Sequence, residues 1–119
     1  TRMTTTIYGI KNCDTMKKAM AWLDAQGVDY RFHDYKKEGA PEARLRQWLT
    51  TLGWETVINR RGTTWRKLDA TLRDSMDGEQ ALAVAMDNPS IIKRPILETG
   101  TALRAGFNEQ DWKQLLKSV

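Results

Sequence analysis

Cys13 is the single cysteine of the 119-residue chain, and it stands where a predicted strand gives way to a predicted helix. Unpaired backbone N–H groups and the helix dipole favour negative charge at a helix N-terminus, which biases this thiol toward the thiolate. Lys11 and Lys17 favour the thiolate as well, whereas Asp14 opposes it. A thiolate attacks electrophiles, so Cys13 is the candidate nucleophile. The alternative is an inert, buried cysteine that only fills the core.

Arginines outside the predicted helices form a second group of candidates. Arg60, Arg94 and Arg104 lie in predicted loops or at strand ends, where side chains from distant segments can converge. A forked guanidinium group binds carboxylates and oxyanions through two parallel hydrogen bonds. For any one of these arginines a solvated surface position is the simpler interpretation. At Arg94, which precedes Pro95, we favour a functional role.

Residues 5–35 predict the elements that would position Cys13. Residues 5–10 are β-branched or aromatic and favour a buried strand, and residues 28–35 alternate with the period of a second strand. Between them an apolar stripe with helical spacing predicts a helix that ends at Gly27. The apolar stripe consists of Met16, Ala19, Met20 and Leu23. The candidates for the N-terminal cap of this helix are Asn12, Asp14 and Thr15. The chain therefore opens as strand, helix, strand.

The remaining segments predict helices followed by a hairpin and a last helix. Residues 41–53 and 78–87 have helical spacing, residues 60–62 indicate a turn, and the apolar residues between 65 and 76 suggest one or two short helices. Extended segments at 90–93 and 96–99 flank Arg94 and Pro95, and a further one at 101–103 completes a hairpin, after which Asn108 can cap the last helix. This order predicts an α/β, thioredoxin-like fold with a mixed four-stranded sheet and a helical insertion at about residues 38–88. We expect a single domain over residues 1–119.

Composition narrows the functional classes. A lone cysteine excludes an internal disulfide, a Cys-x-x-Cys pair and a multi-cysteine zinc site, and the only histidine, His33, has no partner at metal-ligand spacing, so we expect no metal. The net charge of +4 is spread along the chain, and no nucleic-acid partner is expected. The sequence has no apolar run of membrane-spanning length and no apolar signal core, from which we expect a cytoplasmic protein without membrane contact.

Three segments together resemble the arsenate-reductase-like family (ArsC/Spx/YffB), most closely its YffB branch. They are residues 6–18 (TIYGIKNCDTMKK), 58–68 (INRRGTTWRKL) and 91–96 (IIKRPI), and the resemblance extends from residue 5 to about residue 116. It implies a thioredoxin-like fold in which Cys13 is the nucleophile and the Arg94–Pro95 peptide is cis and faces it. It also implies that Arg60 and Arg94 hold an oxyanion, with Arg104 as the nearest candidate for a third arginine.

The resemblance also implies external partners. The family's reductases use one cysteine, with glutathione and glutaredoxin as the source of thiol, which agrees with the single cysteine here. We therefore expect no bound cofactor, glutathione as co-substrate, and a small anionic or disulfide substrate. Lys11, Asn12, Asp14, Thr15 and Pro95 would support the site.

The chain departs from the family's pattern beside the thiol. Arsenate reductases resemble His-Asn-Pro-x-Cys-Gly-Thr-Ser, whereas residues 9–16 read GIKNCDTM. The activating histidine is missing and Asp14 adds negative charge, which both count against arsenate. Met16 stands where Spx proteins often carry a second cysteine, which disfavours a redox-switch regulator. Two hypotheses follow: a glutathione-dependent thiol reductase, or a non-catalytic, Spx-like regulator that binds another protein.

Overall fold

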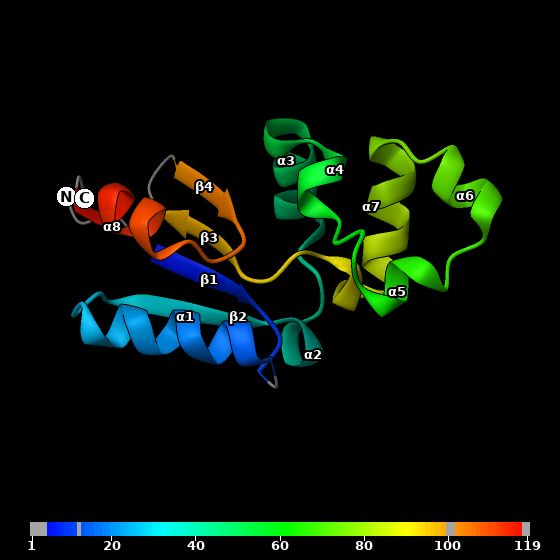
Figure 1. Ribbon diagram of the computed structural model, residues 1–119. Coiled ribbons are helices and arrows are strands. Elements are labelled where there is room, and N and C mark those ends of the chain that lie inside the picture. The colour runs from blue at the N-terminus through cyan, green and yellow to red at the C-terminus, as the bar shows by residue number, and fades with distance from the viewer. Residues whose placement is uncertain (1–4, 12, 100–101, 118–119) are drawn as a thin grey trace. The chain divides into compact units, whose positions relative to one another are not determined.

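The strands β1 to β4 form one mixed four-stranded sheet (Figure 1). The computed structural model describes residues 5–11, 13–99 and 102–117. The strands run in the order β2-β1-β3-β4, with β1 parallel to β2 and antiparallel to β3, and β3 antiparallel to β4. Their bounds are β1 Thr5–Gly9, β2 Tyr30–Asp34, β3 Ile96–Thr99 and β4 Ala102–Ala105. This is the predicted thioredoxin-like arrangement.

Two helices cover one face of the sheet, α1 (Asp14–Ala25) and α8 (Glu109–Lys117). Their apolar stripes meet the inward residues of β1 and β3 in a core whose fully buried members are Ile7, Met16, Ala19, Leu23, Leu97 and Trp112. Asn108 caps α8 as predicted, because its Oδ1 accepts a hydrogen bond of 3.0 Å from the backbone N–H of Asp111. The helix that carries Cys13 at its head is therefore fixed to the sheet by core packing.

The chain divides into two compact units, each described by itself. Residues up to Lys36 and from Arg94 form the first, which holds the sheet; Lys37–Lys93 form the second, which lies in the region predicted to be a helical insertion. The helices between β2 and β3 are α2 Tyr35–Glu38, α3 Glu42–Leu52, α4 Trp54–Val57, α5 Thr63–Arg66, α6 Ala70–Asp74, α7 Gly78–Asp87 and the 3-10 turn η1 Pro89–Ile91.

Packing within the Lys37–Lys93 unit follows from its apolar spacing. Leu45, Trp48 and Leu49 form the buried stripe of α3, which ends where Gly53 adopts a positive φ of 86°. Asp77 caps α7 by accepting a hydrogen bond of 2.8 Å from the N–H of Gln80. The short helices predicted after the turn at residues 60–62 correspond to α5 and α6. The sequence did not predict α4, and the turn that carries Arg60 lies between α4 and α5.

Two local predictions are wrong. Residues 90–93 were expected to be extended, but η1 occupies Pro89–Ile91, and only Ile92 pairs, in a single antiparallel bridge with Ile58. Arg104 was expected to follow the hairpin, but it lies within its second strand, β4. Nothing in the described part of the chain is a helix long and apolar enough to cross a membrane.

Candidate active site

Cys13 occupies the N-cap position of α1. Its backbone is extended (φ −132°, ψ 130°), and its carbonyl accepts the first helical hydrogen bond, 2.9 Å from the N–H of Lys17. No side chain caps this end of the helix within the described residues, so its first N–H groups face the region of the thiol. Cys13 is half-buried against the core shared with α1 and α8. The predicted place of the thiol at the helix start is confirmed.

The peptide bond between Arg94 and Pro95 is cis, as predicted. Tyr8 near the end of β1 pairs with Ile96 at the start of β3, and the carbonyl of Pro95 accepts a hydrogen bond of 2.7 Å from the N–H of Gly106. Because these strands are antiparallel, the end of β1, which leads to Cys13, and the start of β3, which follows Pro95, share one edge of the sheet. The topology thus brings the thiol segment and the Arg94–Pro95 segment to the same edge.

Arg94 is half-buried at this edge, and it forms no ion pair or hydrogen bond among the residues that the structure describes. Its positive charge reaches the hydroxyl of Tyr35, the first residue of α2. Burial raises the pKa of Tyr35 far above its usual value; the charges of Tyr8 and Glu98 raise it further, and Arg94 lowers it. A cation that has no ion pair with any described residue, at the edge where Cys13 lies, is suited to bind an anion.

A polar layer that the sequence did not reveal surrounds Tyr35. The hydroxyl of Tyr8 donates a hydrogen bond of 2.5 Å to Glu98 Oε1, and the ring of His33 lies 5.1 Å from that of Tyr8 and 5.8 Å from that of Tyr35. The hydroxyl of Tyr35 is buried and has no hydrogen-bond partner among the described residues. His33 is half-buried between these aromatic rings. These side chains come from different strands and from α2, so the sequence alone does not show that they lie together. Their proximity follows only from the register of β1, β2 and β3.

Arg104 has its own counter-ion. Its Nε donates a hydrogen bond of 2.9 Å to Asp111 Oδ2 on α8, and its Nη1 donates one of 3.0 Å to the carbonyl of Leu103. In the hairpin register Arg104 lies opposite Leu97, a residue of the core between the sheet and its helices. The guanidinium group is thus engaged in linking β4 to α8.

Arg60 lies in the Lys37–Lys93 unit, in the turn between Ile58 and α5. Its Nη2 is 3.5 Å from Glu55 Oε2, and its guanidinium carbon is 5.6 Å from the centroid of the Trp54 ring. Sequence reasoning missed both contacts, although a tryptophan and an acid just before an arginine turn were a visible signal. The convergence of Arg60 with Cys13 stays a prediction, since each unit is described by itself.

Three of the supporting residues predicted around the thiol lie on the surface. Lys11, Asp14 and Thr15 are exposed near the start of α1. Asn12 lies outside the described residues. No group of three or more His, Cys, Asp or Glu side chains that could hold a metal ion occurs in the described ranges.

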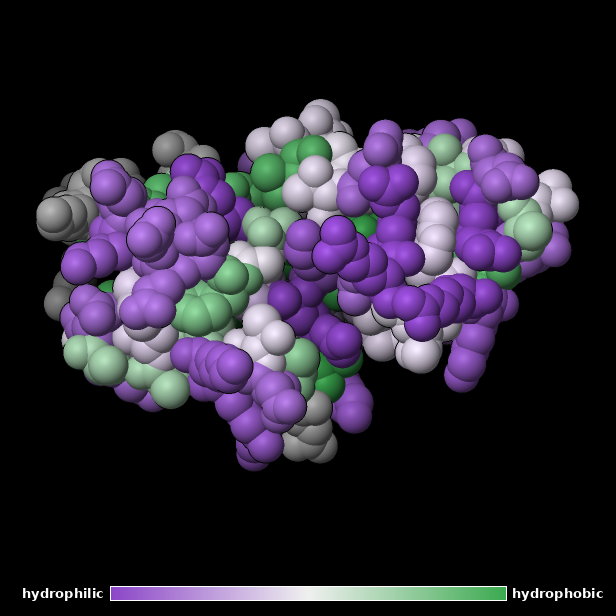
Figure 2. All heavy atoms as spheres, viewed as in Figure 1, coloured by the Kyte–Doolittle hydropathy of each residue, from purple (hydrophilic) through white to green (hydrophobic). Residues whose placement is uncertain are grey.

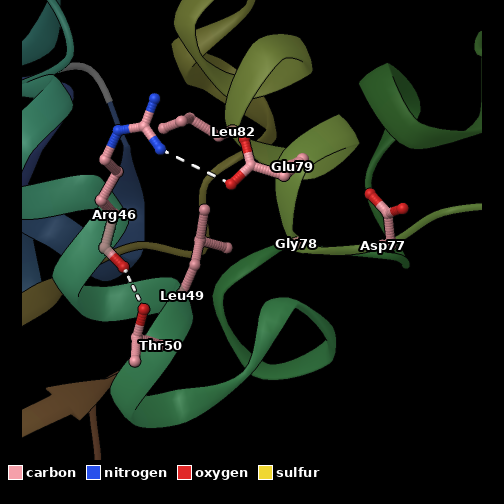
Figure 3. Close-up of a pocket in the computed structure, with 7 residues that line it drawn as sticks. All are labelled: Arg46, Leu49, Thr50, Asp77, Gly78, Glu79 and Leu82. Carbon is pink, nitrogen blue, oxygen red and sulfur yellow. Dashed lines mark hydrogen bonds and ion pairs between the residues drawn. The ribbon is translucent and has the colours of Figure 1, made fainter.

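A pocket of about 530 Å³ lies in the second unit, between α3 and the start of α7 (Figure 3). Arg46 reaches across it to Glu79, with 3.5 Å between Nη1 and Oε1. The lining residues are Arg46, Leu49, Thr50, Asp77, Gly78, Glu79 and Leu82. None of the predicted site residues is among them.

Comparison with known proteins agrees with the resemblance read from the sequence. The model of the ArsC family matches residues 8–115. A solved YffB protein is 47% identical with a TM-score of 0.90, covering 93% of this chain and 97% of its own. An arsenate reductase (ArsC) related protein from Brucella melitensis is 48% identical with a TM-score of 0.77, covering 97% and 96%. The global transcriptional regulator Spx of Staphylococcus haemolyticus is 28% identical over 113 residues, covering 93% of this chain and 86% of its own.

Proposed function

Because the chain belongs to the ArsC family, we propose that it is a glutathione-dependent thiol oxidoreductase in which Cys13 is the nucleophile and Arg94 binds the anionic group of the substrate. Family membership supports the reaction class. The positions of the two residues in the sheet unit support their roles.

The proposed reaction on a disulfide has three thiol exchanges. The Cys13 thiolate attacks one sulfur of the substrate disulfide, forming a mixed disulfide with Cys13 and releasing the other half as a thiolate. A glutathione thiolate then attacks the Cys13 sulfur of the mixed disulfide, which releases the second half of the substrate as a thiolate and leaves glutathione on Cys13. A second glutathione thiolate attacks the bound glutathione sulfur, which frees the Cys13 thiolate and yields oxidised glutathione. The substrate gains two electrons and two glutathione molecules lose them. Glutaredoxin can supply the resolving thiol in place of free glutathione.

Reduction of an oxyanion such as arsenate would also transfer two electrons from two glutathione molecules. Cys13 sulfur would displace water from the arsenic, and glutathione would then attack that sulfur, releasing arsenite and leaving a mixed disulfide on Cys13. A second glutathione would regenerate the thiol. Asp14 beside the thiol opposes the approach of an anion, so we expect a disulfide to react better than arsenate.

The single observation that carries this proposal is the state of Arg94. It has no ion pair among the described residues, and it lies at the sheet edge to which Cys13 also belongs. Leaving a half-buried guanidinium group without a counter-ion is costly unless a ligand offsets its charge. The carboxylates of glutathione or the oxygens of an oxyanion would do so.

A second candidate function is that of a protein-binding regulator, which the similarity to Spx supports. In that case Cys13 would be a core residue without reactivity. Half-burial against the core is compatible with such a role.

Mass spectrometry of the protein mixed with oxidised glutathione separates the two functions. We expect a mixed disulfide on Cys13, its removal by reduced glutathione, and no adduct in Cys13→Ser. A parallel reaction with arsenate and glutathione, followed by arsenite release, tests the oxyanion substrate. A wild-type protein that forms no adduct, and whose thiol alkylates no faster than free cysteine, would favour the regulator.

A further inference from the structure

Arg60 is held by two side chains that precede it in the chain, Trp54 and Glu55. The guanidinium carbon lies 5.6 Å from the centroid of the Trp54 ring, within the range of a cation–π contact. Its Nη2 lies 3.5 Å from Glu55 Oε2. The Trp54 ring is itself stacked on Trp65, with 6.0 Å between centroids and 21° between planes. Arg60 therefore has an aromatic support on its face and a carboxylate at its edge.

Asn59 holds the backbone of the Arg60 turn in place through hydrogen bonds. Its N–H donates a hydrogen bond of 2.8 Å to the carbonyl of Ile91, and its side-chain Oδ1 accepts one of 3.2 Å from the N–H of Arg61. Gly62 closes the turn with a longer bond of 3.4 Å to the Asn59 carbonyl, and a Cβ on Gly62 would lie 3.0 Å from Asn59 Nδ2. With the backbone held, the direction of the Arg60 side chain depends on Trp54 and Glu55.

The two contacts leave the guanidinium group able to bind a ligand. The side chain of Arg60 is 50% exposed and that of Glu55 is 64% exposed, and the surface over α4 and α5 is mixed in hydropathy in Figure 2. A ring contact covers the flat face of a guanidinium group and consumes none of the N–H donors at its edges. An exposed carboxylate at 3.5 Å binds weakly, so a well-placed anion can displace it.

We propose that Trp54 and Glu55 are positioning residues for Arg60 with opposite effects on anion binding: Trp54 holds the guanidinium group in place, and Glu55 competes with the anion for its N–H edge. This inference rests on the proposed function and on the prediction, implied by the resemblance, that Arg60 also binds the anion. It makes Glu55 a determinant of specificity, because only an anion that offers Arg60 more than one monodentate carboxylate contact gains from the exchange.

The test is that substitutions at the adjacent residues 54 and 55 should change anion binding in opposite directions. Binding of inorganic sulfate is measured by calorimetry at low ionic strength. For oxidised glutathione, the half-saturating concentration and the limiting rate of mixed-disulfide formation are measured. Glu55→Gln should tighten both by about two- to fivefold, the worth of an exposed ion pair. Trp54→Leu should weaken both by about two- to fivefold, with the limiting rate unchanged. Trp54→Phe keeps an aromatic face and should recover part of the loss.

The chain offers a matched control in Glu79→Gln. Glu79 is paired with Arg46 at 3.5 Å, the same distance as Glu55 from Arg60, and lies in the same unit. This variant changes the net charge as Glu55→Gln does, but it should leave both affinities unchanged. If it tightens binding equally, the effect is one of overall charge and the inference is overturned.

Arg60→Ala separates failure of this inference from failure of the proposed function. If Arg60→Ala weakens binding while Glu55→Gln and both Trp54 variants match the wild type, the inference is overturned and the function stands. If Arg60→Ala changes neither affinity, Arg60 is outside the anion site and the inference fails with it, while the Cys13 adduct still decides the chemistry. Should Trp54→Leu fail to fold, as seen by circular dichroism, Glu55→Gln and Trp54→Phe decide the matter.

Discussion

Arg104 on β4 and Asp111 on α8 form a hydrogen-bonded ion pair, with 2.9 Å between Nε and Oδ2. Both side chains are about two-fifths exposed, at 42% and 43%. The pair joins the last strand to the last helix, and it engages the guanidinium group that sequence reasoning had offered as a third anion ligand. This contact sets Arg104 apart from Arg94.

Removing Arg104 should therefore affect stability more than ligand binding. Because the pair is partly exposed, we expect Arg104→Ala to lower the free energy of unfolding by about 1 kcal/mol or less, and Asp111→Asn to have a similar effect. The double variant should lose less than the sum of the two. Urea unfolding measures these values. If Arg104→Ala impairs turnover as severely as Arg94→Ala, Arg104 belongs to the anion site after all.

Arg94→Ala should impair turnover of glutathione-linked substrates without unfolding the protein. The loss should correspond to at least one charged hydrogen bond, about 1.5–3 kcal/mol in the ratio of kcat/KM values. Arg94→Lys restores the charge without the fork and should recover only part of that loss. The control for removal of an arginine is Arg46→Ala. Arg46 belongs to the other unit and lines the pocket between α3 and α7. Full activity of Arg94→Ala would remove the main support of the proposed function.

Asp14→Asn should increase the reactivity of Cys13. Asp14 is the first residue of α1 and follows the thiol directly, so its carboxylate repels an anionic reagent that approaches the sulfur. We expect faster alkylation by iodoacetate, which is anionic, at pH 7, together with a loss of about 0.3–1 kcal/mol in stability, because an acidic residue is removed from the first turn of a helix. Asp24→Asn, in the last turn of the same helix, is the matched control. Equal rates for wild type and Asp14→Asn would show that this charge does not act on the thiol.

Tyr35→Phe should leave stability at pH 7 unchanged or slightly raised, because the hydroxyl that it removes is buried without a partner. Burial holds the pKa of Tyr35 above its unfolded value of about 10. As pH rises past 10 the unfolded chain loses this proton first, so the wild type should lose stability more steeply than Tyr35→Phe. Urea unfolding at pH 7 and at pH 10.5 compares the two. A clear destabilisation of Tyr35→Phe at pH 7 would reveal a partner for the hydroxyl.

Local patterns in the sequence were sufficient for the elements around the thiol. The stripe of Met16, Ala19 and Leu23 is buried as its spacing indicates, and Cys13 lies at the start of that helix. The cis peptide before Pro95 followed from the resemblance and is present. Each of these features depends on a few neighbouring residues or on a motif, which is why they could be predicted.

Features that depend on how separate elements pack against one another could not be predicted. The β-branched pair Ile91 and Ile92 suggested a strand, but Pro89 starts a 3-10 turn and leaves only one of the two paired. The pairing of Arg104 with Asp111 requires α8 to return beside β4, which no local pattern encodes. The same is true of Tyr8 and Glu98, which are 90 residues apart in the chain.

The central strand pairing has a consequence for the order in which the chain can fold. The hydroxyls of Thr5 and Thr99 share a hydrogen bond across β1 and β3, 94 residues apart, with the whole Lys37–Lys93 unit between them. During synthesis β1 leaves the ribosome before β3, and the strand edge of β1 that pairs with β3 stays unpaired until the intervening residues have been made. Such late, long-range closure slows folding and exposes an unpaired strand edge in the meantime. We therefore expect the nascent sheet, rather than the continuous helical segment, to be the part most prone to aggregation and most dependent on chaperones.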